Sequence, residues 1–223
     1  MVQKFAILAG QVYLVILVIN TLISVFRYQQ LPAKVKTITP YLLIALATDL
    51  SSRWLFAKHV NNLYLLHIYT LLEFVAWSYF YQRLFQDKQW SQTKMPWLVG
   101  TVSILVIANS IFLEPVTGFN SNAKTLVQVI LIAYSIYYFF ITFGKIDLRQ
   151  PLPRSVSFIN FAVLLYYSGS LFIFMFSKLM ASQGIASSMQ HGFWAINALL
   201  LVLLHALIFV SLWMVVFRKT TSS

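Results

Sequence analysis

The sequence predicts an all-α integral membrane protein, a single bundle of seven transmembrane helices, and its composition is the first reason. Of the 223 residues, 60% are hydrophobic and only 9% are charged, whereas about 25% of the residues of an ordinary soluble domain are charged. The same hydrophobicity excludes an intrinsically disordered chain. The chain has no cysteine, which excludes a disulfide scaffold, thiolate chemistry and cysteine-bound metals.

Seven segments have the length and apolar character of membrane-spanning helices, which need about 20 residues to cross about 30 Å of hydrocarbon. In chain order they are approximately 5–26, 40–57, 62–85, 96–113, 124–143, 155–178 and 191–217. The first exceeds the roughly 7 to 15 apolar residues of a signal peptide, so we assign it as the first helix. The connecting loops are short, and residues 1–223 are therefore expected to form one transmembrane domain.

Prolines and glycines indicate that most of these helices are unbroken. All six prolines fall in loops or at helix ends, whereas secondary transporters often have Gly- or Pro-interrupted helices in matching positions. The sixth segment contains Ser168, Gly169 and Ser170 in its middle. Small residues allow helices to approach closely, so we expect tight packing at this point, and a flexible point in the helix is the alternative.

Basic residues are distributed unevenly between the two ends of the predicted helices. The first, third and fifth loops and the C-terminal tail hold eleven, which are Arg27, Lys34, Lys36, Arg83, Lys88, Lys94, Lys145, Arg149, Arg154, Arg218 and Lys219. The N-terminus and the other loops hold four, which are Lys4, Lys58, Lys124 and Lys178. Because short cytoplasmic loops are rich in Lys and Arg, the N-terminus is predicted outside and the C-terminus in the cytoplasm.

The net charge of +11 is therefore explained by topology. We expect the lipid bilayer, with its anionic inner leaflet, to be the partner of these loops. Nucleic acid is not an expected partner, because its binding needs a continuous basic face.

Four ionisable side chains lie deep in the second and third predicted helices, and they are Asp49, Arg53, His67 and Glu73. Such a group costs at least about 2.5 to 3.5 kcal/mol at the bilayer centre, and it usually faces the bundle interior with a partner. Asp49 and Arg53 are four residues apart and can pair directly. The candidates to neutralise Glu73 are Arg53 and His67.

Helical periodicity divides the third segment into two faces at about 100° per residue. One face carries Asn62, His67, Thr70, Glu73, Trp77 and Tyr81, and the opposite face carries Tyr64, Ile68, Leu72, Val75 and Tyr79. We expect the first face in the bundle and the second in lipid. The seventh segment has a comparable stripe of His191, Trp194, Asn197, Ala198 and His205.

Depth along the helices places several of these side chains at one level. With the N-terminus outside and a rise of about 1.5 Å per residue, Arg53 and His67 lie roughly 7 to 9 Å below the outer helix ends. Asp49, Glu73 and Asn197 lie near the same level or somewhat deeper. We therefore predict a ligand-binding pocket in the outer half of the bundle, lined by Asp49, Arg53, His67, Glu73, Trp194 and Asn197.

Catalytic and cofactor signatures are absent from the sequence. There is no HExxH, GxSxG, Walker or GxGxxG motif, and the seventh segment has no lysine for a retinal Schiff base. His191 and His205 are separated by roughly 21 Å along one helix and cannot share a metal. We expect no cofactor and no metal, although a set of His67, Glu73 and one of these histidines remains an alternative.

Three stretches resemble a family of small, uncharacterised seven-helix membrane proteins of Bacteroidota: NNLYLLHIYTLLEFVAWSYFY, LLYYSGSLFIFMFSKLM and FWAINALLLVLLHALIFVSLW. More loosely, the chain resembles the seven-helix sensory modules of bacterial histidine kinases, without a kinase. The resemblance implies a seven-helix topology and a bacterial inner membrane, and it carries over no catalytic residue.

These observations favour a ligand-sensing or regulatory membrane protein of the inner membrane. A small-molecule ligand or a proton would bind among the polar side chains, shift the helices, rearrange the basic third and fifth loops, and signal to a cytoplasmic partner protein. Three alternatives remain open: a small-solute transporter or channel, a structural subunit of a membrane complex, and an intramembrane enzyme that uses Glu73 and His67 as acid and base.

Overall fold

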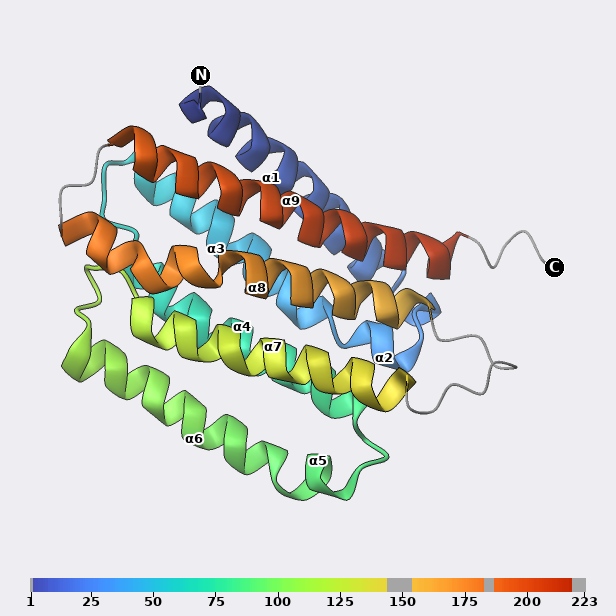
Figure 1. Ribbon diagram of the computed structural model, residues 1–223. Helices are drawn as coiled ribbons and strands as arrows, with labels where there is room; N and C mark the ends of the chain where they lie inside the picture. Colours follow the sequence, from blue (N-terminus) through green and yellow to red (C-terminus); the bar gives the residue numbers. More distant parts are fainter. Residues whose placement is uncertain (1, 144–153, 183–186, 218–223) are drawn as a thin grey trace.

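The computed structural model describes residues 2–143, 154–182 and 187–217, and these residues form helices joined by short connections (Figure 1). The described part contains no strand. The long helices are α1 (Val2–Phe26), α3 (Thr39–Ala57), α4 (Tyr64–Leu84), α6 (Met95–Ala108), α7 (Ser121–Phe143), α8 (Arg154–Ser182) and α9 (Ser187–Val216). The short ones are η1 (Tyr28–Gln30), α2 (Ala33–Lys36), α5 (Gln89–Thr93) and the π-helical turn η2 (Asn109–Leu113).

Five helical segments of the described chain are long and apolar enough to cross a membrane. They lie in α1, in α6 with η2, in α7, and in the parts of α8 and α9 at Arg154–Phe176 and His191–Val216. The two other predicted spans, α3 and α4, form helices of 19 and 21 residues, about 28 and 31 Å long. They are less apolar because their inward faces carry polar side chains.

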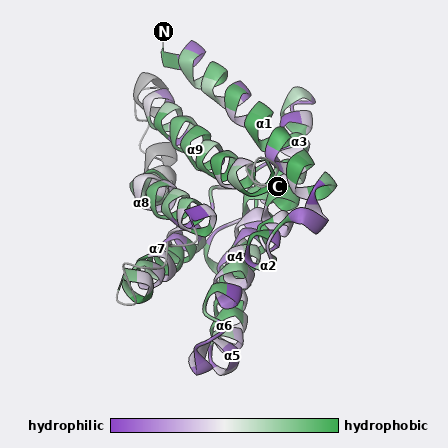
Figure 2. Ribbon diagram, turned by 90° about the vertical axis from the view of Figure 1, so that its right-hand side faces the viewer, coloured by the Kyte–Doolittle hydropathy of each residue, from purple (hydrophilic) through white to green (hydrophobic). Residues whose placement is uncertain are grey.

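The helices are arranged in two rows that α1 joins at one side. One row runs α1, α9, α8, α7, and the other runs α1, α3, α4, α6, with each helix packed on the next. Viewed from one end of the bundle in Figure 2, α9, α8 and α7 follow one another downward on the left, and α3, α4 and α6 do so on the right. The helices α4 and α7 also contact each other, which brings the rows together in the middle of the molecule.

The two predicted faces of the third segment are confirmed in α4. On the inward face, His67 is 5% exposed and Glu73 is fully buried. On the outward face, the fractional exposure is 51% for Ile68 and 40% for Leu72. A helix with one polar buried face and one apolar exposed face packs as expected in a bundle surrounded by lipid.

Local signals explain several helix ends. Pro40 and Pro96 stand in the first turns of α3 and α6, where their missing N–H groups cost nothing. His59 has a φ of 57° directly after α3, and its N–H bonds to the Phe56 carbonyl, which closes the helix with a left-handed residue.

Several of the residues that the sequence analysis places in loops lie outside the described residues. They are Lys145, Arg149, Pro151, Pro153, Arg218 and Lys219, and the side chain of Lys178 is not described either.

One prediction about segment limits needs correction. The fifth segment was expected to begin at residue 124, but α7 begins at Ser121, and Lys124 is consequently a buried helix residue and not an outer-loop charge. The first and third loops contain the short helices η1, α2 and α5.

Close packing of α8 on α9 at Gly169 agrees with the prediction from the small residues. A Cβ atom at Gly169 would lie 2.9 Å from Cδ2 of Leu200, whereas one at Gly100 of α6 would meet nothing within 4 Å. Both substitutions to alanine gain the same helix propensity of about 1 kcal/mol, but only Gly169→Ala must displace the end of the Leu200 side chain, and this overpacking offsets part of the gain.

We therefore expect Gly169→Ala to unfold more readily than Gly100→Ala in thermal or denaturant unfolding of the detergent-solubilised protein. Equal stability of the two variants would show that α8 and α9 have room to separate at this point.

Candidate functional site

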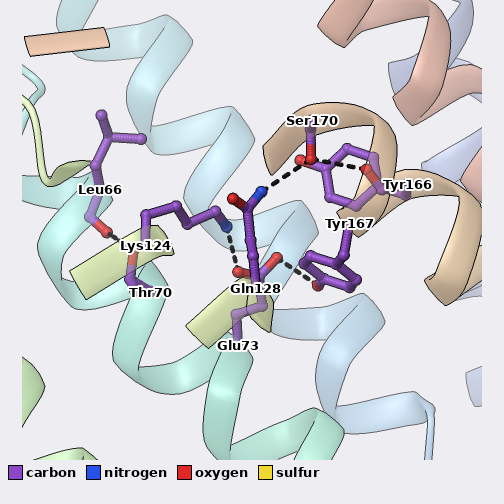
Figure 3. A network of polar contacts seen from close by, with 8 residues as sticks. All are labelled: Leu66, Thr70, Glu73, Lys124, Gln128, Tyr166, Tyr167 and Ser170. Carbon is purple, nitrogen blue, oxygen red and sulfur yellow. Dashed lines mark hydrogen bonds and ion pairs between the residues drawn. The ribbon is translucent and has the colours of Figure 1, made fainter. Parts of the chain in front are cut away.

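A buried ion pair lies at the centre of the bundle. The Nζ atom of Lys124 on α7 donates to Oε2 of Glu73 on α4 (Figure 3). The side chain of Glu73 is fully buried and that of Lys124 is 5% exposed. The hydroxyl of Tyr167 on α8 donates to the other carboxylate oxygen over 2.8 Å. One carboxylate therefore connects three helices.

Aromatic rings surround the ammonium group of this pair. The Nζ atom of Lys124 lies 5.1 Å from the ring centroid of Tyr69, 5.2 Å from that of Phe174 and 5.9 Å from that of Tyr167. Taking an ion pair out of water costs several kcal/mol for each ion, and cation–π contacts return part of that cost where the cation is desolvated. The rings and the tyrosine hydroxyl thus offset part of the free-energy cost of burying the pair.

The position of Lys124 depends on how the chain enters α7. The buried carboxylate of Glu114 accepts hydrogen bonds from Nδ2 of Asn109 at 2.8 Å and from the backbone N–H of Asn122 at 3.1 Å. A carboxylate at a helix N-terminus is favourable because the N–H groups there lack partners. One turn beyond Lys124, Nε2 of Gln128 donates to Oγ of Ser170 on α8 at 2.8 Å, which fixes the rotation of α7.

A cavity of about 190 Å³ opens beside the ion pair. It lies between the two helix rows, in the half of the bundle that contains the end of α3 and the starts of α4, α7 and α9. Its lining consists of Tyr13, Ala45, Thr48, Asp49, Ser52, Leu66, Tyr69, Thr70, Phe119, Asn120, Lys124, Tyr166, Phe174, Trp194, Asn197 and Leu201. Six of these side chains are aromatic, so the walls are mainly apolar with a few polar groups.

The charges at the cavity are already neutralised. Asp49 accepts from Nε of Arg53 at 2.6 Å, and Nη2 of Arg53 donates to the Gly10 carbonyl of α1 at 2.9 Å. Lys124 is paired with the buried carboxylate of Glu73. The groups without a partner are neutral: Nδ2 of Asn120 and Oδ1 of Asn197 are buried and make no hydrogen bond.

The predicted site residues are only partly brought together. Asp49, Trp194 and Asn197 line the cavity. Arg53 is not part of the lining, but it forms an ion pair with Asp49. Glu73 does not line the cavity, but it contacts Lys124, which does. His67 is turned toward the connection between α6 and α7, where its ring nitrogens lie 2.8 Å from Oγ of Ser110 and 3.3 Å from the Gly118 carbonyl oxygen.

The partner of Glu73 is neither of the two candidates from the sequence. Neither Arg53 nor His67 neutralises it, because Arg53 is held at Asp49 and Gly10 and Lys124 occupies the carboxylate. The error follows from assigning Lys124 to a loop. A sequence signal was present, since Lys124, Gln128 and Ser135 recur at helical spacing within an apolar segment and all three are buried.

The cavity is closed toward the opposite end of the bundle by packed aromatic rings. Tyr41 and Trp77 lie with centroids 4.4 Å apart, and Trp77 packs on Phe80 at 5.5 Å. His205 lies among them, 5.2 Å from the ring of Tyr13, and neither of its ring nitrogens has a hydrogen-bond partner.

Among the described residues, no group of three His, Asp or Glu side chains could hold a metal ion.

Breaking the buried pair from one side leaves an uncompensated charge, so Glu73→Gln or Lys124→Met alone should lower the free energy of unfolding by about 3 to 5 kcal/mol. The double variant removes both charges and should lose less than the sum of the two. Asp49→Asn is the matched control, because a partly exposed pair contributes at most about 1 kcal/mol. Denaturant unfolding in detergent measures all four, and additive losses in the double variant would contradict a direct interaction.

Comparison with protein-family models, with curated proteins and with solved structures gave no match at a significant level. The resemblance to seven-helix proteins of Bacteroidota therefore stays a prediction. The interpretation of the cavity rests on its own geometry: an apolar, aromatic space that is closed at one end and has neutral hydrogen-bonding groups and internally paired charges.

Proposed function

We propose that this protein is a ligand-sensing membrane protein whose ligand enters the cavity between the two helix rows. The observation that carries the proposal is a preformed cavity with aromatic walls in one half of the bundle, with the packed rings of Tyr41 and Trp77 toward the other half. Ligand sites are typically concave, mainly apolar, and equipped with a few polar groups that orient the ligand.

The size and charge of the cavity favour a small neutral ligand. Its volume of about 190 Å³ is below the roughly 300 to 1,000 Å³ of sites for drug-sized molecules, but it exceeds the 150 Å³ that suffices for benzene. A charged ligand would have to compete with the existing ion pairs. A single ring with a hydrogen-bond donor and acceptor suits the free amide atoms of Asn120 and Asn197.

The proposed topology has seven spans in the inner membrane, with α3 and α4 as the second and third and with the N-terminus outside. The lengths of α3 and α4 support it, and so does the excess of basic residues at the other end. In this orientation the cavity faces the exterior. Lys34, Lys36 and Arg83 then lie on the cytoplasmic side, where a signalling partner would bind.

A signal can pass from the cavity through the buried ion pair. Lys124 lines the cavity and also joins α7 to α4 and, through Glu73, to Tyr167 of α8. A ligand that contacts Lys124 or Trp194 would change how these helices pack. It shifts the equilibrium only by the difference of its affinities for the two packings.

Small-solute transport is the second candidate, because ionisable pairs buried at mid-depth in a membrane bundle often mark translocation paths. The two functions differ in accessibility, since a transporter must open its site to both sides of the membrane. The natural chain has no cysteine, so single cysteines report accessibility without a background signal.

We expect Thr48→Cys, in the cavity wall, to react with a membrane-impermeant thiol reagent from the exterior only. Gln86→Cys, exposed at the other end, should react from the cytoplasmic side only. Labelling of intact cells and of inverted vesicles measures both. Reaction of Thr48→Cys from both sides would favour transport, and exterior reaction of Gln86→Cys would overturn the orientation.

Benzamide is a suitable probe for occupancy, because it is a neutral ring with a donor and an acceptor. It should raise the unfolding temperature of the purified protein, while benzoate and benzylamine should bind at least about tenfold more weakly because a buried charge needs a partner. Thr48→Phe fills the cavity and should abolish the effect. Ala47→Phe, one residue away on the exposed face of α3, is the control, and equal losses in both variants would contradict binding in the cavity.

A further inference from the structure

A second concave site lies at the opposite end of the bundle, between the start of α3 and the end of α4. It is a cleft of about 420 Å³ lined by Tyr28, Ala33, Lys34, Lys36, Thr37, Pro40, Tyr79, Arg83 and Gln86. No acidic side chain is among them. We call it the basic cleft, and its three cations come from two segments that are far apart in the sequence, the loop with α2 and the last turn of α4.

The three cations of the basic cleft have no acidic partner among the described residues, where the ion pairs are those of Asp49 and Glu73. Two of them are held by tyrosine rings instead. Nζ of Lys36 lies 5.0 Å from the ring centroid of Tyr28, and the guanidinium carbon of Arg83 lies 5.5 Å from that of Tyr79. Such contacts position the cations and leave their N–H groups free for an anion.

An apolar stripe runs from the basic cleft along the outer face of α4. Ile68, Leu72, Val75 and Tyr79 follow at helical spacing, and their side chains are 40% to 51% exposed. The stripe is about 16 Å long, which is close to half of the roughly 30 Å hydrocarbon thickness. The adjacent helix α3 has exposed apolar side chains at the same spacing, at Leu43, Leu50 and Trp54.

We propose that the basic cleft and this stripe together form a binding site for one anionic phospholipid. Lys34, Lys36 and Arg83 bind the phosphate, and an acyl chain lies along α4. Basic pockets between transmembrane helices are suited to anionic headgroups, and the tyrosines match the aromatic and basic residues found at membrane interfaces. The apolar stripe distinguishes a lipid from free phosphate, because only a lipid uses both parts of the site. This site does not depend on the ligand proposed for the cavity.

The test measures lipid binding to the full-length protein in a neutral detergent, by native mass spectrometry and by the rise in unfolding temperature. The probes are dioleoyl phosphatidylglycerol, which is anionic, dioleoyl phosphatidylcholine, which has the same chains without net charge, and glycerol 3-phosphate, which has the phosphate without chains. We expect phosphatidylglycerol to bind the wild-type protein more tightly than either of the others.

The triple variant Lys34→Gln/Lys36→Gln/Arg83→Gln should bind phosphatidylglycerol on the order of 100-fold more weakly, at about fivefold for each cation. Arg27→Gln/Lys88→Gln/Lys94→Gln removes the same charge at the same end of the bundle but outside the cleft, and it should bind like the wild type. The charge-retaining variant Lys34→Arg/Lys36→Arg/Arg83→Lys should keep most of the affinity, which shows that the loss is not misfolding.

Two results would overturn the proposal. Equal weakening in both glutamine variants would mean that the protein attracts anionic lipid by its overall charge and has no specific site. Glycerol 3-phosphate binding as tightly as phosphatidylglycerol would mean that the cleft binds phosphate without a lipid.

Discussion

The architecture depends on placing the carboxylate of Glu73 inside an apolar bundle. A buried carboxylate without a partner costs far more than a helix contact can return, so the bundle must bring a cation to it. Lys124 does this from α7, and Tyr167 adds a hydroxyl from α8. Since α4 belongs to one row of helices and α7 and α8 to the other, this pair links the two rows, as does the hydrogen bond from Tyr81 of α4 to Asn160 of α8.

The cavity exists beside the ion pair because the rows separate there. On the side of the pair away from the cavity, large rings such as Tyr41, Trp77 and Phe80 fill the space between the rows and are nearly fully buried. On the side of the pair that contains the cavity, the connection from η2 to α7 is held by Glu114 and Asn109, and the aromatic side chains there line the space without filling it. A buried ion pair adds little to the free energy of unfolding, but it can determine how helices are placed. Here the placement of the helices around the pair leaves the cavity beside it.

Much of the helical architecture could be predicted from the sequence, because hydrophobic length and periodicity act locally. The two faces of α4 and the close approach at Gly169 are examples, since each follows from side-chain size and spacing within one segment. The pairing across helices could not be predicted in this way. Assigning Lys124 to a loop hid the one cation that reaches Glu73, and proximity in depth suggested Arg53 and His67, which bond instead to Asp49 and Gly10 and to Ser110.

The pairing of charges inside the bundle also bears on what the cavity can do. The charges are held in fixed pairs: Lys124 and Glu73 bind each other, and Arg53 is shared between Asp49 and a backbone carbonyl. Beyond them, toward the other end, the Tyr41 and Trp77 rings pack closely together, and buried polar groups such as Asn20 and His205 lie in the same half of the bundle. A cavity with aromatic walls, internally paired charges and unbonded amide groups offers a ligand apolar contacts and hydrogen bonds, and this is the basis of the proposed sensing function.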